Sequence, residues 1–127
     1  MEAIREESEP LVERRRLPRL KVSTPVQFRD VLKPQETFTG SLSKEISVGG
    51  IRMNAPGFVA QESRLVLLLS LPSLLKPMRA IGRVVWVREQ PFAQGYDCGV
   101  QFVEIAPEDR EALADYVERG IVQAPGR

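Results

Sequence analysis

Hydrophobic and polar residues alternate along most of the chain with a period close to two, which is the pattern of half-buried β-strands. The pattern begins after Ser23 and returns over residues 36–46, and Ile51 and Met53 open a third stretch. Glycine, proline and asparagine residues separate these stretches and predict turns. The first half of the chain therefore predicts three short strands.

Three further strands are predicted in the second half. Residues 63–71 put alternate leucines on one face, and residues 78–88 are rich in β-branched residues. Residues 96–105 place Cys98 and Phe102 on one face of a final strand. Six short strands predict an all-β fold, and closure of an antiparallel barrel removes their exposed edges.

Only the end of the chain has helical spacing. Pro107 can occupy a first helical turn, and Leu113, Tyr116 and Val117 form an apolar stripe. Gly120 is a typical helix stop, so one C-terminal helix is predicted over residues 107–119.

At 127 residues the chain is long enough for one core and too short for two. The prediction is a flexible polar tail over residues 1–12 and one domain over residues 13–120, with a C-terminal tail over 121–127. Within the domain, residues 13–22 form an arm and residues 23–105 form the barrel.

Composition disfavours several functions, among them a third alternative, a barrel that binds single-stranded nucleic acid. The formal charge of +1 gives no protein-wide field for a long nucleic acid, and 6% aromatic residues supply few stacking platforms for single strands. No histidine is present, which removes the usual general base and the usual zinc ligand. We expect no catalytic residues, no metal and no cofactor: the protein is predicted not to be an enzyme.

No segment has the pattern of a leader or a membrane span. Residues 1–16 lack the apolar centre of a signal peptide, and the run Leu65–Leu71 is far shorter than the roughly 20 residues of a membrane-spanning helix. Cys98 is the single cysteine and is interpreted as a small buried hydrophobe, and Trp86 as a core or barrel-end residue. A cytoplasmic protein without membrane insertion is expected.

Positive charge gathers just before the first predicted strand. Residues 13–21 carry five basic side chains against Glu13, a local charge of +4. Arg15 and Arg19 lie on a segment that Pro18 keeps extended. Guanidinium groups bind phosphate through two parallel hydrogen bonds and also bind purine edges, so this arm fits a phosphate-and-purine ligand.

A second candidate segment ends the strand predicted over residues 36–46. Glu45 and Ser47 are two residues apart and can point to one side of the sheet, just before Gly49 and Gly50. The carboxylate and hydroxyl could read the Watson–Crick donors of guanine. The paired glycines are expected to supply the positive φ angles of a tight turn.

Together, the two segments resemble the paired signature of PilZ domains. Arg15-x-x-x-Arg19 matches the RxxxR motif, and Glu45-x-Ser47-x-x-Gly50, which begins 26 residues after Arg19, is similar to [D/N]xSxxG. The strand around Trp86, the following strand and the terminal helix also resemble that family, so the similarity covers roughly residues 13–120.

The resemblance implies a six-stranded antiparallel PilZ-like split barrel that binds the bacterial second messenger cyclic di-GMP. Arg15 and Arg19 would contact phosphates and guanine, Ser47 would bind the ligand, and Gly49 and Gly50 would shape the turn. Arg14, just before the motif, would accompany an intercalated dimer of the ligand. A lone receptor domain of this kind, monomer or homodimer, would signal to an effector protein that the sequence does not identify.

Glu45 is the one departure from the family pattern, which has Asp or Asn there. The extra methylene moves the carboxylate by more than an ångström in a site where hydrogen-bond geometry is strict. This leaves an alternative function open, a divergent PilZ domain that acts as a ligand-independent protein-interaction module.

Overall fold

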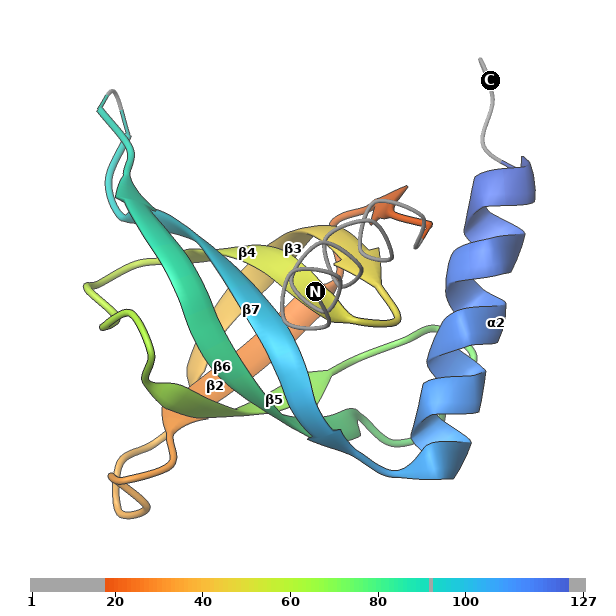
Figure 1. Ribbon diagram of the computed structural model, residues 1–127, viewed down its shortest axis with the longest axis horizontal. Coiled ribbons are helices and arrows are strands. Elements are labelled where there is room, and N and C mark those ends of the chain that lie inside the picture. Colours follow the sequence, from red (N-terminus) through yellow and green to blue (C-terminus); the bar gives the residue numbers. More distant parts are fainter. Residues whose placement is uncertain (1–17, 92, 124–127) are drawn as a thin grey trace, which may run out of the picture.

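The strands form a single antiparallel sheet that closes on itself (Figure 1). The structure, a computed structural model, describes residues 18–91 and 93–123. These residues form seven strands and one helix. In chain order they are β1 (Leu20–Lys21), β2 (Pro25–Asp30), β3 (Thr39–Ser47), β4 (Gly50–Ala55), β5 (Arg64–Leu69), β6 (Met78–Glu89), β7 (Tyr96–Ile105) and α2 (Pro107–Gln123).

Six of the strands make a closed barrel, as predicted. Neighbours follow the order β3-β2-β5-β6-β7-β4, and the pairing of β4 with β3 completes the circle. Strand β1 is additional and lies in the predicted arm, where it pairs with β3 alone. Among the described strands, closure leaves the six barrel strands paired on both sides, and β1 pairs on one side.

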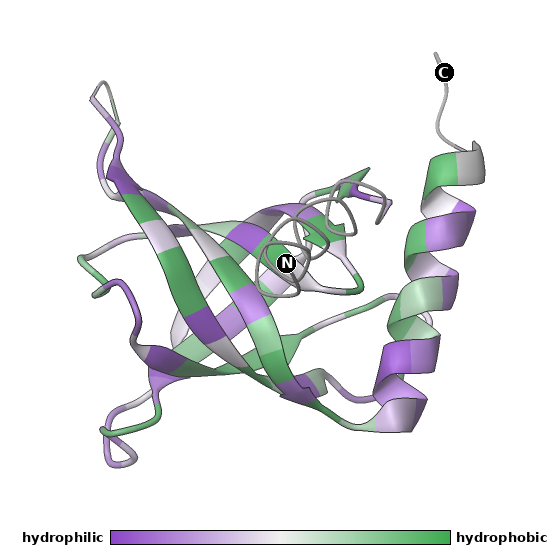
Figure 2. Ribbon diagram, viewed as in Figure 1, coloured by the Kyte–Doolittle hydropathy of each residue, from purple (hydrophilic) through white to green (hydrophobic). Residues whose placement is uncertain are grey.

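The strand alternation found in the sequence separates the core from the surface. Leu65, Leu67 and Leu69 of β5 all point inward and are at most 2% exposed. Figure 2 shows hydrophobic and hydrophilic residues alternating along the barrel strands. Cys98 is fully buried in β7, as interpreted from the sequence.

One strand begins later than predicted. The strand expected over residues 36–46 starts at Thr39, because the residues before it form a turn. In that turn the Lys33 N–H donates to the Asp30 carbonyl at 3.0 Å, and the Glu36 N–H donates to the Lys33 carbonyl at 3.1 Å.

Helix α2 packs its apolar stripe on the barrel and runs further than predicted. Leu113 and Val117 are buried. The predicted stop at Gly120 is wrong, since the helix continues to Gln123. Gly120 is there for packing: a Cβ at this position would lie 2.5 Å from Cδ2 of Leu20. Within the described residues, no helix is long and apolar enough to cross a membrane.

Candidate functional site

Pairing of β1 with β3 brings the basic arm to the second predicted segment. Leu20 lies opposite Ile46, and both side chains are buried in the core. Because side chains alternate along a strand, Arg19, Glu45 and Ser47 are on the outer surface of the barrel. The same register sets Arg19 beside Ser47. Residues far apart in the sequence thus meet on one face.

These residues line a cavity of about 360 Å³ on the outside of the barrel, across β3, β4, β7 and β6. That volume lies within the range of small-molecule sites, about 300–1,000 Å³. The lining contains five of the residues predicted from the sequence: Arg19, Glu45, Ser47, Gly49 and Gly50. The other two predicted site residues, Arg14 and Arg15, lie outside the described residues.

The hydroxyl of Ser47 organises the turn between β3 and β4. It accepts a hydrogen bond from the Gly49 N–H at 3.1 Å and donates to the Gly50 carbonyl at 3.4 Å. These two hydrogen bonds hold the turn in place, and the Ser47 side chain also lines the cavity. A ligand that forms a hydrogen bond with this hydroxyl would therefore also affect the conformation of the turn.

The expectation of positive φ angles at Gly49 and Gly50 is wrong. Among the described residues, left-handed backbone occurs at Glu62, with φ 73°, and at Gly95, with φ 99°. Gly50 is needed for close approach instead, because a Cβ there would lie 2.1 Å from the carbonyl oxygen of Val100 in β7. The glycine lets β4 and β7 pair directly beside the turn.

Trp86 lines the same cavity and is not among the core residues, so the core position is wrong for a residue interpreted from the sequence as a core or barrel-end residue. Its indole lies over Gly99, and the guanidinium of Arg88 lies 5.1 Å from its ring centroid. An indole in this position offers a π-surface inside a cationic cavity, which suits a purine base.

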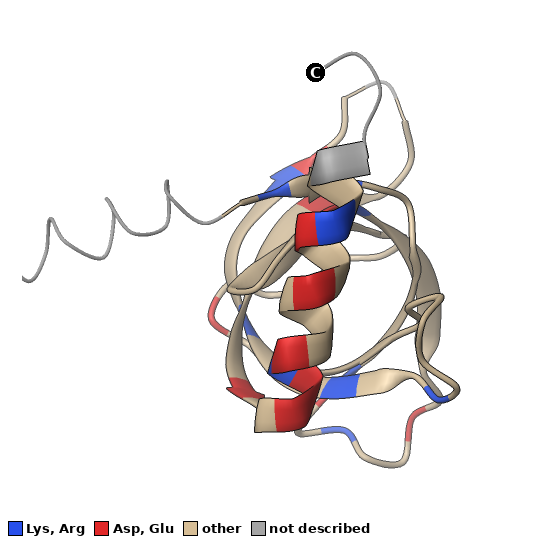
Figure 3. Cartoon of the chain, turned by 90° about the vertical axis from the view of Figure 1, so that its right-hand side faces the viewer, with Lys and Arg blue, Asp and Glu red and all other residues tan. Residues whose placement is uncertain are grey.

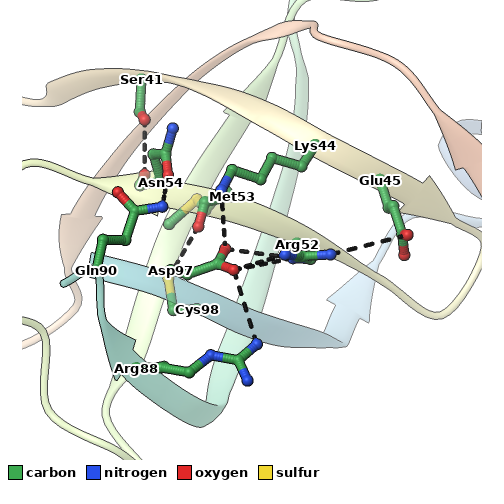
Figure 4. A network of polar contacts seen from close by, with 10 residues as sticks. All are labelled: Ser41, Lys44, Glu45, Arg52, Met53, Asn54, Arg88, Gln90, Asp97 and Cys98. Atoms are coloured by element: carbon green, nitrogen blue, oxygen red, sulfur yellow. Dashed lines mark hydrogen bonds and ion pairs between the residues drawn. The ribbon is translucent and has the colours of Figure 1, made fainter. Parts of the chain in front are cut away.

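A buried carboxylate organises the cations behind the cavity (Figure 4). Asp97 in β7 is 4% exposed and accepts hydrogen bonds from Arg52, at 2.7 Å from Nη2 and 3.1 Å from Nε. Lys44 Nζ lies 3.6 Å and Arg88 Nη2 3.9 Å from the same carboxylate. Arg52 also faces Glu45, with its Nη1 4.0 Å from Oε2.

Opposing effects act on this carboxylate. Burial raises the pKa of Asp97, but the Arg52 hydrogen bond and the charges of Lys44, Arg52 and Arg88 outweigh it and hold the pKa below its ordinary value. The hydrogen bond to Asp97 raises the pKa of Arg52 in turn. The pair is therefore fully ionised at neutral pH, and Arg52 is a fixed cation.

The cavity lining is positively charged overall. It holds Arg19, Arg52 and Arg88 against the single carboxylate of Glu45, a net charge of +2. Acidic residues recur instead along α2 (Figure 3). The exposed ones are Glu108, Glu111, Asp115 and Glu118. None of these lines the cavity, so an anion is favoured there.

Neither metal chemistry nor thiol chemistry is indicated in the part of the chain that the structure describes. It contains no group of three His, Cys, Asp or Glu residues that could hold a metal ion. Burial raises the pKa of the Cys98 thiol to about 11, with a further contribution from the Asp97 charge. Such a thiol is not a nucleophile near pH 7.

The fold is thus a small closed β-barrel with a cationic cavity on its outer face. The chain belongs to the PilZ domain family, which matches residues 13–119. The family predicted from the sequence is thereby confirmed.

Solved structures with the same fold include three informative neighbours. Inhibitor of motility MotI/DgrA of Bacillus subtilis is 25% identical, with a TM-score of 0.73 over 86% of this chain and 52% of its own. The PilZ domain of YcgR from Escherichia coli, solved with cyclic di-GMP, is 12% identical, with a TM-score of 0.69 over 87% and 94%. The MrkH–cyclic di-GMP complex of K. pneumonia is 20% identical, with a TM-score of 0.66 over 86% and 53%.

The chain thus spans about half the length of MotI/DgrA and MrkH, and corresponds to nearly the whole of the YcgR domain. A comparison with curated proteins gives no match. Several of the neighbours are below 25% identity, and they define the fold of the chain rather than its ligand.

Sequence reasoning missed several residues of the site. Arg52, Arg88 and Gln101 line the cavity but lie in neither motif. The sequence allows Arg88 to extend the basic ligand surface but favours a solvated strand-face arginine, and it shows no pairing of Asp97 that argues for acid–base catalysis. One signal was present in the pattern: Arg52 is two residues after Gly50 and therefore points to the same side of β4. The contact with Asp97 spans 45 residues and depends on the β4–β7 register, in which Arg52 pairs with Gly99.

Proposed function

We propose that this protein is a receptor for cyclic di-GMP that signals by binding and has no catalytic activity. The single observation that carries the proposal is the meeting of Arg19 with Glu45 and Ser47 in one cationic cavity on the barrel surface. The structures of YcgR and MrkH with cyclic di-GMP support the choice of ligand. A receptor for this intracellular messenger would work in the cytoplasm.

Charge supports an anionic ligand. Cyclic di-GMP carries two phosphodiester charges, and the lining has a net charge of +2. Arg19 presents a guanidinium fork that matches a phosphate bidentately, and Arg15 would supply a second fork from the same arm. Arg14 would add a third positive charge, in keeping with an intercalated ligand dimer.

The remaining lining groups suit a guanine base. Glu45 is an acceptor-only side chain and complements the N1–H and N2–H₂ donors of the Watson–Crick edge. Trp86 offers a ring face for stacking, worth about 1–3 kcal/mol per base. Gly49 and Gly50 leave the backbone of the turn open to the ligand.

Signalling would come from the arm. Residues 13–17 precede β1 directly, so arginines that engage phosphate would fix this segment against the barrel next to Arg19. The ordered arm would present a new surface to an effector protein, and the free energy of binding would drive the change. The energetic requirement is only that the ligand prefers the ordered form.

The test is calorimetric titration of the purified protein with cyclic di-GMP, alongside Arg15→Ala, Arg19→Ala and Ser47→Ala variants. Binding at micromolar or tighter affinity is expected, and loss of one bidentate arginine should weaken it by about 10–100-fold. Stoichiometry reports one ligand or an intercalated pair. Arg79→Ala is the matched control, since Arg79 is exposed on β6 outside the lining, and GTP is the ligand control.

Absence of heat together with absence of thermal stabilisation at high ligand concentration would reject the receptor function. The alternative would then take its place, a ligand-independent protein-interaction module. The Glu45 departure is the one observation that favours it.

A further inference from the structure

Asp97 is the only charged residue in the buried class among the described residues. An ionised carboxylate out of water is costly unless it is paired and hydrogen-bonded. Here three cations from three different strands surround it: Lys44 of β3, Arg52 of β4 and Arg88 of β6. Burying this charge is costly, and its position beside the cavity points to a role other than stabilising the fold.

Arg52 lies between two carboxylates but forms hydrogen bonds with only one of them, Asp97. Asp97 accepts from both Nε and Nη2, at 3.1 and 2.7 Å, which is a two-point hold. Glu45 lies 4.0 Å from the remaining Nη1, beyond hydrogen-bond distance. Figure 4 shows the guanidinium between the two, turned toward Asp97.

Asp97 binds Arg52 from outside the cavity that contains Glu45. Asp97 does not line the cavity that contains Glu45, but lines a neighbouring cavity that shares Arg52 and Arg88 with the first. Arg52 is therefore drawn away from Glu45. Glu45 lines the first cavity, and no side chain of the described residues donates a hydrogen bond to its carboxylate oxygens.

An arginine without this hold would take Glu45 as its partner. The closest Arg52–Glu45 distance exceeds a charge-assisted hydrogen bond, about 2.7–2.9 Å, by only about an ångström, which one side-chain torsion can close. A guanidinium bound bidentately to Glu45 would occupy the oxygens that must accept from guanine. Arg52 would then compete with the ligand.

We propose that Asp97 is a positioning residue of the nucleotide site, which holds Arg52 off Glu45 so that the Glu45 carboxylate stays a free acceptor for guanine. This inference rests on the proposed receptor function. It also accounts for Glu in place of Asp or Asn: a longer acidic side chain near an arginine is usable when that arginine is already engaged.

The test is calorimetric titration with cyclic di-GMP of the parent, Asp97→Asn, Arg52→Gln and the double variant. Asp97→Asn makes the site more positive, so nonspecific electrostatics alone would tighten binding of a dianion. We expect the opposite, a loss of about tenfold. The double variant restores the net charge of the parent and removes the competing guanidinium, so its affinity should recover to within about threefold of the parent.

A matched control separates this effect from the loss of an ion pair in general. Asp115→Asn removes the Asp115–Arg119 pair on α2, at 3.0 Å, by the same isosteric change and should leave affinity unchanged. If Asp97→Asn does not fold, Arg52→Lys replaces it. Lysine keeps the charge but cannot keep a two-point hold, so affinity should fall by several-fold.

The outcomes are distinct. Loss in Asp97→Asn with recovery in the double variant supports the inference. A folded Asp97→Asn that binds as well as the parent or better overturns it and leaves the receptor function standing, and so does a loss that the double variant fails to relieve. A parent that binds no cyclic di-GMP removes both the receptor function and this inference.

Discussion

The indole of Trp86 occupies the space that a side chain at Gly99 would fill. A Cβ on Gly99 would lie 2.2 Å from Nε1 of the indole. In the sheet, Gly99 pairs with Trp86 of β6 on one side and with Arg52 of β4 on the other. Gly99 therefore lies between Trp86 and Arg52 in the sheet, and its missing side chain leaves room for the indole.

Gly99→Ala is expected to displace Trp86 and weaken cyclic di-GMP binding. The added methyl group cannot share the space of the indole, so the ring must move, and about tenfold in affinity should be lost with the stacking surface. Trp86 is the only tryptophan, so a shift of its fluorescence maximum in the free protein reports the displacement directly.

Gly57→Ala is the control for that prediction. Nothing lies within 4 Å of a Cβ at Gly57, so fluorescence and affinity should stay at the parent values. An unchanged emission maximum in Gly99→Ala would show that the indole is not held by this glycine.

Gly50→Ala should destabilise the fold. The new Cβ would meet the backbone carbonyl of Val100 at 2.1 Å, and a backbone atom paired in the sheet cannot turn aside as a side chain can. The free energy of unfolding should fall by about 2–3 kcal/mol, measured by denaturant titration. Gly40→Ala, with nothing within 4 Å of its Cβ, should change stability by under about 1 kcal/mol, and equal losses in the two variants would contradict the argument.

The barrel was predictable because each of its strands can be recognised from neighbouring residues in the sequence. A period of two identifies each strand whatever it pairs with, and six such strands with turn residues between them leave few architectures other than a closed barrel. The alternation also placed Glu45 and Ser47 correctly on one side of β3. Their separation by a core residue, Ile46, is visible in the sequence itself.

Contacts between distant residues were not predictable in the same way. Position 120 lacks a side chain because Leu20, a hundred residues earlier, packs against it, and the helix runs on through Gly120 to Gln123. The ion pair of Asp97 was not predicted because its partner Arg52 is found through the β4–β7 register, which the pattern of one strand does not contain. Trp86 was interpreted as a core or barrel-end residue because large aromatic side chains are often buried, but Gly99 leaves room for its indole on the outer face.

Leu20→Ala should uncouple the arm from the barrel. Leu20 joins β1 to both Ile46 and α2, and the next residue toward the N-terminus is Arg19. We expect a loss of about 2 kcal/mol of unfolding free energy, at the low end for a buried leucine because β1 is an edge strand. Ligand affinity of the folded fraction should fall as well.

Leu113→Ala tests whether that second effect is specific. Leu113 is fully buried on α2, so its truncation should cost at least as much stability. Leu113 does not line the cavity and is not part of the arm, so the ligand affinity of the variant should equal that of the parent. Equal affinity losses in both variants would assign the effect to general destabilisation.

Cys98 should lower stability at high pH. Burial raises its thiol pKa to about 11 from an ordinary value of 9.0, so the native state keeps a proton that the unfolded state releases. Its contribution is complete below pH 9 and is lost as the pH rises toward 11, about 2–3 kcal/mol in all. Cys98→Ala should lack this decline, and identical pH profiles for parent and variant would contradict it.

Asp97 should act at the opposite end of the pH scale. Its pKa is held below the ordinary value because the Arg52 hydrogen bond and the neighbouring cations outweigh the effect of burial. A depressed pKa stabilises the native state above the unfolded pKa, near 3.9, and this contribution disappears as the pH falls through the native pKa. Denaturant unfolding of the parent and Asp97→Asn should therefore show the largest stability difference at pH 5–7. The difference should begin to shrink below about pH 4, where the unfolded chain takes up the proton, and should disappear as the pH falls through the lower native pKa, where the parent carboxyl is protonated and resembles the amide. A difference that stays constant across this range would mean that packing around residue 97, rather than its charge, stabilises the barrel.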